Sequence, residues 1–189
     1  MSGSAAEDTR LTELALAAGS GDRRALEAFV RGTQRDVWRF VAHLAGIRHA
    51  DDLAQETYLR ALKSIRRFSG FSSARTWLLS IARRVVVDHI RYECSRPRTD
   101  TAADWSAACD REQARNHAPR YESIVELNLL LDKLDPQRRE ALLLTQVFGL
   151  SYQEAAEVCG CAVGTIRSRV ARAREQLLSL ESQSSEGTG

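Results

Sequence analysis

The chain has 189 residues, enough for one or two domains with a hydrophobic core, and a formal net charge of +2. No apolar run approaches the length of a bilayer span, and the polar, acidic start MSGSAAEDTR is unlike a secretion signal. These features argue against a secreted or membrane-inserted protein. They favour a soluble cytoplasmic protein with reduced cysteines.

Helical periodicity dominates the chain and strand alternation is absent, so we expect an all-α protein. Helices are predicted near residues 10–18, 23–45, 51–66, 73–92, 119–133, 136–148, 152–159 and 163–180. Residues 93–118 mix charge, Pro, Ser and Ala without a periodic face, which predicts a flexible linker between helical domains at 10–92 and 119–180. The ends, 1–9 and 181–189, are expected to be disordered.

The stretch DDLAQETYLRALKSI, residues 51–65, predicts a helix with two different faces. Asp52 with Gln55 is expected to cap its start. The predicted core face contains Leu53, Ala54, Thr57, Tyr58, Ala61, Leu62 and Ile65. The other face contains Asp52, Gln55, Glu56, Leu59, Arg60 and Lys63. Acidic groups around one apolar anchor are typical of a protein interface, and a solvated helix with one stray leucine is the alternative.

The next stretch combines exposed aromatics with a basic helix. Gly70 and neighbouring serines predict a loop at 69–73, flanked by Phe68 and Phe71, with Ser72 or Ser73 capping the following helix. One side of that helix carries Trp77, Leu78, Ile81, Val85 and His89, and another carries Arg83, Arg84, Val87, Asp88 and Arg91. Residues 60–98 hold ten Arg or Lys against two acidic residues, an excess of +8. This combination suits single-stranded nucleic acid, whose bases stack and whose phosphates need cations. His89 is expected to be a core histidine.

The C-terminal part predicts a helix-turn-helix. Asp135 and Pro136 provide an N-cap and a first-turn proline for one helix. Ser151 and Glu154 fit a capping box for the next, and Gly160 fits its left-handed end. A short helix, a tight turn with glycine and a basic second helix are the parts of this motif.

The second helix of the motif begins AVGTIRSRVARARE, residues 162–175. Its apolar stripe consists of Ile166, Val170, Ala173 and Leu177. Small residues and hydroxyls lie opposite, with arginines at the rims, so the helix is suited to approach a DNA groove closely. A solvated arginine-rich face is the alternative, but the capping box and the turn glycine in register favour DNA binding.

Nothing in the sequence predicts an enzyme or a cofactor. The cysteines lack C-x-x-C spacing, and no histidine stands at a ligand offset from a cysteine pair. Cys159 and Cys161 fall inside the predicted turn, where small packing residues are expected. The histidines form no recognisable set with a nucleophile, and no glycine-rich phosphate loop occurs.

Three stretches together resemble bacterial RNA polymerase sigma factors of the extracytoplasmic-function type: DDLAQETYLRAL, WLLSIARRVVVDHIR and LSYQEAAEVCGCAVGTIRSRVARARE. The resemblance covers about residues 12–180, and QRDVWRF at 34–40 is similar to the actinobacterial SigC-type members. It implies an N-terminal sigma region 2 domain that binds the polymerase clamp and opens the −10 element. It also implies a C-terminal region 4 domain that reads the −35 element as duplex.

The resemblance assigns residues to each surface. The polymerase-binding residues are Asp52, Gln55, Glu56 and Leu59. The −10 residues are Phe68, Phe71, Ser72, Arg75, Arg83, Arg84, Asp88 and Arg91. The −35 residues are Arg167, Ser168, Ala171, Arg172 and Arg174. The implied partners are promoter DNA, core RNA polymerase through its β′ clamp and β flap, and a separate anti-sigma factor.

Two positions depart from the family pattern. Ala162 stands where many relatives have proline, and Arg84 stands where asparagine is common, so the −10 preference is expected to differ. A helix-turn-helix regulator that acts without being a polymerase subunit is the main alternative function. The all-helical 10–92 segment argues against the receiver domain of a response regulator, and the +8 segment argues against a pure protein adaptor.

Overall fold

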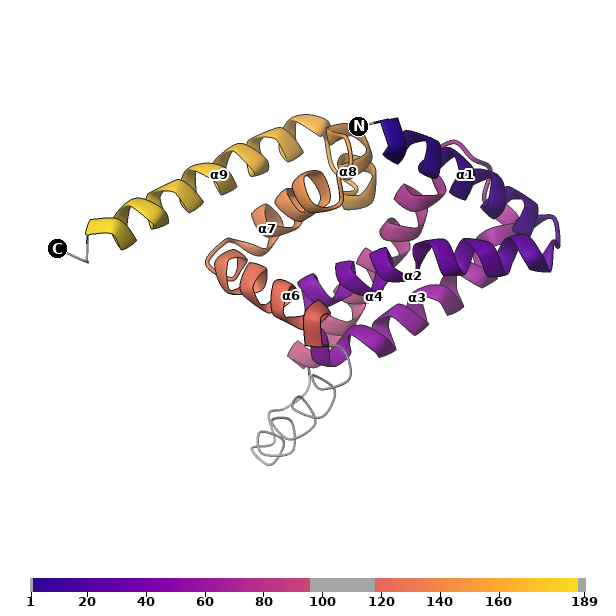
Figure 1. Ribbon diagram of the computed structural model, residues 1–189, viewed down its shortest axis with the longest axis horizontal. Coiled ribbons are helices and arrows are strands. Elements are labelled where there is room, and N and C mark those ends of the chain that lie inside the picture. The colour runs from indigo at the N-terminus through magenta and orange to yellow at the C-terminus, as the bar shows by residue number, and fades with distance from the viewer. Residues whose placement is uncertain (1, 96–117, 187–189) are drawn as a thin grey trace, which may run out of the picture. The chain divides into compact units, whose positions relative to one another are not determined.

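The computed structural model describes residues 2–95 and 118–186, with side chains for 5–95, 124–125 and 127–179. Within these ranges the chain forms helices and turns and no strand, which confirms the predicted all-α class (Figure 1). The chain divides into two compact units, residues 1–125 and 126–189. No helix in the described ranges is long and apolar enough to span a membrane.

The first unit is built around α2. Its elements are α1 (Ser2–Gly19), α2 (Arg23–Ala45), η1 (Ile47–His49), α3 (Ala50–Ser64), η2 (Ile65–Arg67) and α4 (Ala74–Ser95). Helix α2 packs against α1, α3 and α4. It begins because the Asp22 side chain accepts hydrogen bonds from the Arg24 and Ala25 amides. Its Phe29, Val37 and Phe40 are at most 1% exposed and form the centre of the core.

Two close contacts fix α1 on this core. A Cβ added to Gly19 would lie 2.8 Å from the Ile65 carbonyl oxygen, so α1 ends directly against η2. The Thr12 hydroxyl accepts a hydrogen bond of 3.0 Å from the Ala74 amide, which ties the start of α4 to α1. The Ile65 carbonyl is a backbone atom that cannot easily move, which leaves little room for a larger residue at Gly19.

Residues 2–9, for which disorder was expected, belong to α1, which begins at Ser2. Leu11 and Ala15 anchor the helix in the core, and a helix that is already nucleated extends at low cost. Helix α9 likewise continues to Glu186, although disorder was predicted from residue 181. After Gly164 in its first turn, no glycine or proline occurs before Gly187.

The second unit contains the end of α6 (Ala118–Leu131), then α7 (Pro136–Leu142), η3 (Leu143–Val147), α8 (Tyr152–Cys159) and α9 (Val163–Glu186). Helices α7 and α8 both pack against α9. The predicted 136–148 helix changes at Leu143 into one π-helical turn, in which the Phe148 amide donates to the Leu143 carbonyl. This wider turn places Leu143, Leu144 and Phe148 all in the core, each at most 2% exposed.

The predicted linker lies almost entirely outside the described residues, since α4 continues to Ser95 and α6 begins at Ala118. Trp105 and Cys109 fall in that range. The division between the two units falls within α6, between Val125 and Glu126.

Candidate nucleic-acid interface

The helix-turn-helix forms through the local signals seen in the sequence. Ser151 and Glu154 make a capping box, with the Ser151 amide donating to Glu154 Oε2 at 2.9 Å. Gly160 ends α8 in the left-handed conformation with φ of 63°. The side chains of Ile166, Val170 and Ala173 on α9 are at most 1% exposed. The buried stripe therefore fixes which face of α9 points outward.

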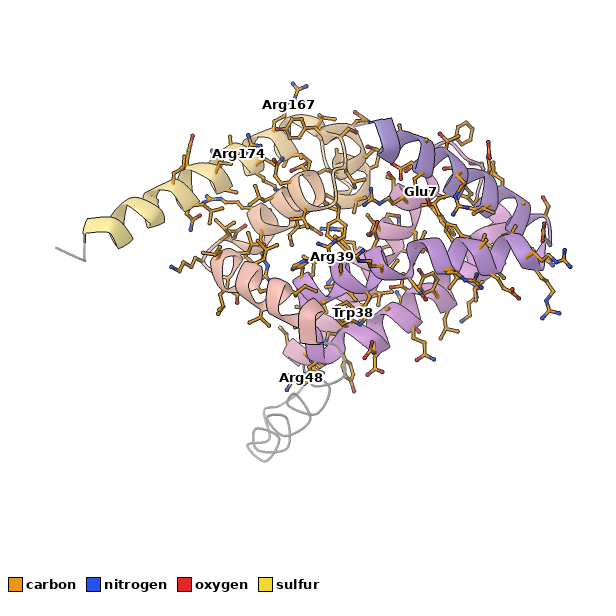
Figure 2. The ribbon with its side chains drawn as sticks, in the orientation of Figure 1. Glu7, Trp38, Arg39, Arg48, Arg167 and Arg174 are labelled. Carbon is orange, nitrogen blue, oxygen red and sulfur yellow. The ribbon has the colours of Figure 1, made fainter. Side chains whose placement is uncertain are left out.

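All five predicted −35 residues lie on exposed parts of α9: Arg167, Ser168, Ala171, Arg172 and Arg174. Figure 2 shows Arg167 projecting away from the helix. Within the described residues, Arg167 and Arg172 make no hydrogen bond or ion pair with the protein. Ser168 donates its hydroxyl to the Thr165 carbonyl at 2.9 Å. A face of small side chains and unengaged guanidinium groups fits a DNA groove.

Two other arginines of α9 are held by neutral amides. Arg169, half-buried, donates from Nη2 to Gln137 Oε1 at 2.5 Å and from Nη1 to Cys161 Sγ at 3.8 Å. Arg174 donates from Nη2 to Gln146 Oε1 at 2.8 Å. An amide orients a guanidinium group without neutralising it, so Arg174 keeps its positive charge on the exposed face.

In the first unit, α4 carries an exposed face made by Arg84, Asp88 and Arg91. These residues are spaced by four and three positions, so they lie side by side along the helix. Asp88 is bound to Arg60 of α3, at 2.6 Å between Oδ2 and Nη1. Arg83 lies beside this face and is half-buried.

Arg75 points elsewhere. Its Nη2 lies 2.8 Å from Oδ2 of Asp36 on α2, and its side chain is only 14% exposed. The family resemblance grouped Arg75 with the −10 residues, and the structure places it in the first turn of α4. Nine positions separate Arg75 from Arg84, which places them on opposite sides of one helix.

The loop before α4 contains one exposed and one packed phenylalanine. Phe71 is 99% exposed, next to Gly70, whose φ of 75° favours glycine. Phe68 stacks on Trp77 with ring centroids 4.9 Å apart. Ser73, one of the two residues predicted to cap α4, accepts a hydrogen bond of 3.1 Å from the Thr76 amide. Ser72, the other candidate, is half-buried.

The predicted polymerase-binding residues share an exposed face of α3. Asp52 and Gln55 are exposed, Leu59 is 48% exposed, and Glu56 is half-buried against Arg60. Leu62, expected in the core, is 42% exposed on the same helix. We call Asp52, Gln55, Glu56, Leu59 and Leu62 the α3 face. The buried residues Leu53, Thr57 and Ala61 lie within about 80° of one another around α3, and Leu62 lies about 100° beyond Ala61, outside that core face.

The predicted cap of α3 is wrong. The helix begins at Ala50, and Asp52 lies inside its first turn without a capping bond. Asp51 in the same turn instead accepts a hydrogen bond of 2.7 Å from Trp38 Nε1 on α2. Carboxylates in a first turn still interact favourably with the helix dipole.

Histidine side chains meet where α4 passes the start of α3. The rings of His49 and His89 have centroids 4.4 Å apart. Burial, then His89 and Arg48, lower the pKa of His49. His89 is half-buried at this contact and is not part of the core, contrary to the role expected from the sequence.

Sequence reasoning missed Arg60 as a bridging residue. Its Nε contacts Glu56 at 2.7 Å and its Nη1 contacts Asp88 at 2.6 Å, and the bonds to Asp88 and Glu56 raise the pKa of Arg60. The spacing of Glu56 and Arg60 by four residues was a visible signal for the first contact. The second contact joins residues 28 positions apart and needs the packed helices.

The described residues include no group of three or more potential metal ligands. Cys159 is buried in the helix-turn-helix, and Cys161 is half-buried. This arrangement agrees with packing roles for the turn cysteines.

Comparison with known proteins identifies the family. Residues 29–94 match the model of Sigma-70 region 2, and residues 124–177 match Sigma-70 region 4. The chain is 57% identical over 178 residues to the ECF RNA polymerase sigma factor SigC of Mycobacterium tuberculosis strain CDC 1551, covering 94% of this chain and 95% of the relative. The ECF sigma factor EcfG of Rhodopseudomonas palustris is 44% identical, over 69% of this chain and 70% of the relative.

Solved structures agree. CnrH, in complex with the cytosolic domain of CnrY, aligns with a TM-score of 0.70 at 26% identity, covering 92% of this chain and 98% of CnrH. RpoE of Bartonella quintana, in complex with the anti-sigma factor NepR, aligns with a TM-score of 0.63 at 25% identity, covering 83% and 96% of the two chains. The fold and the helix-turn-helix define a helical transcription protein. It belongs to the ECF RNA polymerase sigma factors.

Proposed function

We propose that this sigma factor binds core RNA polymerase in the cytoplasm, recognises the −35 and −10 promoter elements and promotes DNA melting at initiation. The outward face of α9 is the single observation that supports this most strongly. It combines Arg167 and Arg172, which no described protein group engages, with the small Ser168 and Ala171, opposite a buried stripe. Such a face serves duplex readout.

At the −35 element, the residues of α9 have different proposed roles. Arg167 and Ser168 lie near the helix start, the end that enters the major groove in helix-turn-helix proteins. Arg172 and Arg174 lie further along, where phosphates are nearer. Gln146 fixes the direction of the Arg174 guanidinium group. We assign Arg167 to base readout and Arg174 to phosphate binding.

At the −10 element, Phe71 is the proposed stacking surface for an unpaired base because its ring is almost fully exposed. Arg84 and Arg91 are the proposed phosphate contacts beside Asp88, together with Arg83 and Ser72. Phe68 and Arg75 contact Trp77 and Asp36, so we assign them the role of holding the loop and the start of α4 in place.

The α3 face is the proposed site for the β′ clamp of the polymerase. It presents carboxylates around the exposed apolar side chains Leu59 and Leu62, which is the composition of an interface core with a polar rim. For the β flap we propose α6, where Leu129 and Leu130 are 64% and 57% exposed. Regulation by an anti-sigma factor is proposed from RpoE, which was solved with NepR.

We propose limits for the two domains that agree with these assignments. Residues 10–92 form the region 2 domain and residues 119–180 the region 4 domain, with 93–118 between them. The matched segments 29–94 and 124–177 fall largely within these limits.

Run-off transcription tests the proposal directly. Core polymerase with this protein is mixed with a promoter library, and the selected promoters are sequenced. Promoter-specific transcripts that require the protein are expected. Specific duplex binding without polymerase, and no transcripts with it, would instead identify a regulator that is not a polymerase subunit.

A further inference from the structure

Arg60 touches both proposed surfaces of the first unit. Its Nε donates to Glu56 Oε1 at 2.7 Å on the α3 face, and its Nη1 donates to Asp88 Oδ2 at 2.6 Å on α4. The side chain of Arg60 is 40% exposed, and those of Glu56 and Asp88 are 43% and 51% exposed. One guanidinium group therefore joins a carboxylate proposed for polymerase binding to a carboxylate proposed for the −10 element.

The chemistry of the bridge requires arginine. A guanidinium group presents five N–H donors in a rigid plane, so different edges bind two carboxylates at once. Lysine offers one ammonium centre on a flexible chain and is not equivalent. The charges also matter, because one cation is shared between two anions, and each carboxylate competes for it.

The competition affects the face that meets DNA. Asp88 lies between Arg84 and Arg91 on α4, and neither of these arginines binds it in the described structure. Arg60 supplies the neutralising charge from the neighbouring helix instead. Arg84 and Arg91 therefore stay available, and the carboxylate of Asp88 is held in one direction. Without Arg60, Asp88 is expected to turn toward Arg84 or Arg91, or to repel phosphates.

We propose that Arg60 is a positioning residue that couples the α3 face to the −10 face of α4 by holding Glu56 and Asp88 together. The coupling rests on the proposed function. A clamp cation that engages Glu56 removes one competitor for Arg60, so Arg60 pairs more fully with Asp88. Polymerase binding then favours the DNA-binding arrangement of α4, and by linkage −10 DNA tightens polymerase binding.

The experiment compares Arg60→Gln, Arg60→Lys, Glu56→Gln and Asp88→Asn in the full chain, with Arg31→Gln as the matched control. Arg31 is an exposed arginine of α2 that makes no hydrogen bond or ion pair with the described residues. Core affinity is measured by titration. The −10 preference is measured at saturating core, as the ratio of opening rates on promoters that differ at one −10 base. Because this is a ratio within one variant, a change in the folded fraction does not move it.

Arg60→Gln is expected to strengthen core affinity by up to about 5-fold, the range for an exposed ion pair, because Arg60 no longer competes with the clamp cation for Glu56. It should shift the −10 preference in the same direction as Asp88→Asn. Adding Asp88→Asn to Arg60→Gln should shift the preference no further. Adding Glu56→Gln to Arg60→Gln should weaken core affinity more than Glu56→Gln does in the wild-type chain, because Glu56 then has only the clamp as a partner. Arg60→Lys should fall between wild type and Arg60→Gln, and Arg31→Gln should match wild type.

If Asp88→Asn changes the −10 preference and Arg60→Gln does not, the coupling is overturned, but the proposed function is not. Additive effects in the double variants, or no shift in any single variant, overturn it as well. The proposed function fails separately, if the wild-type protein with core polymerase gives no promoter-specific transcript.

Discussion

Arg174 of α9 donates a hydrogen bond of 2.8 Å to Gln146 of η3, which joins the recognition helix to the π-helical turn of the second unit. Gln146 in turn donates from Nε2 to the Thr145 hydroxyl at 3.1 Å. The guanidinium group is thus oriented by a chain of neutral groups while its charge stays unpaired. Arg167, at the start of the same helix, has no such support.

Because only Arg174 is oriented by a protein group, Arg167 and Arg174 are expected to make two different kinds of −35 contact. Arg167→Ala is expected to cost roughly 1–3 kcal/mol and to relax the preference at one −35 base pair. Arg174→Ala should weaken all sequences about equally and lower the salt slope by about one. Binding of holoenzyme to promoters with single −35 changes, at several salt concentrations, measures both effects. The opposite pattern, with Arg174→Ala changing base preference, would reverse the orientation of α9 on DNA.

The α3 face gives a second prediction. Changing Asp52, Gln55 and Glu56 together to Ala should abolish co-purification with core polymerase, because the face loses its carboxylates. The thermal melt should stay close to that of wild type, since surface ion pairs such as Glu56 with Arg60 contribute only about 0.2–1 kcal/mol. Normal co-purification of a folded triple variant would contradict the assignment of this face.

Phe71 gives the third. Phe71→Ala should slow open-complex formation, because stacking of a base on an aromatic ring is worth about 1–3 kcal/mol. Stability should not change, as the ring is 99% exposed. Permanganate footprinting over time measures melting. Phe68→Ala is the comparison, and it should lower the melting temperature because Phe68 packs on Trp77. Wild-type opening rates in Phe71→Ala would mean that the exposed ring is not used.

Two glycines give opposite stability predictions. Gly19→Ala should destabilise the first unit by about 1–3 kcal/mol, because the added Cβ would lie 2.8 Å from a backbone oxygen of Ile65. Gly164→Ala on α9 meets nothing within 4 Å and should stabilise its helix by about 0.5–1 kcal/mol. Denaturant unfolding of the two variants provides the test. Equal effects at both positions would show that helix propensity alone determines the change in stability.

The raised pKa of Tyr58 predicts that the free energy of unfolding decreases at alkaline pH. Burial raises its pKa to about 12, against the lowering effect of its hydrogen bond to Thr33 at 2.8 Å. A pKa raised above the unfolded value of about 10 means that the stabilisation is complete below pH ~10 and falls as the pH rises toward 12. Denaturant unfolding from pH 8 to 12 should show this loss in wild type. Tyr58→Phe should remove that part of the pH dependence; an unchanged pH profile would assign the loss to other groups.

The local structure of the helix-turn-helix follows from short-range signals in the sequence. Ser151, Glu154 and Gly160 act through hydrogen bonds and backbone conformation within a few residues, so their pattern predicts the capping box and the left-handed end that the structure shows. The buried stripe of α9 follows from helical periodicity for the same reason. Helix bounds were less certain at the chain ends, because extension of a nucleated helix has no strong sequence signal.

Which charged side chains remain available for binding depends on how the helices pack against one another. Arg75 and Arg84 come from one basic helix, yet Asp36 binds the first while the second stays exposed. The bond between Arg60 and Asp88 spans 28 residues and exists because α3 packs on α4. Ion pairs of this kind depend on the distance between helices, and the sequence pattern of each helix contains no information about that distance.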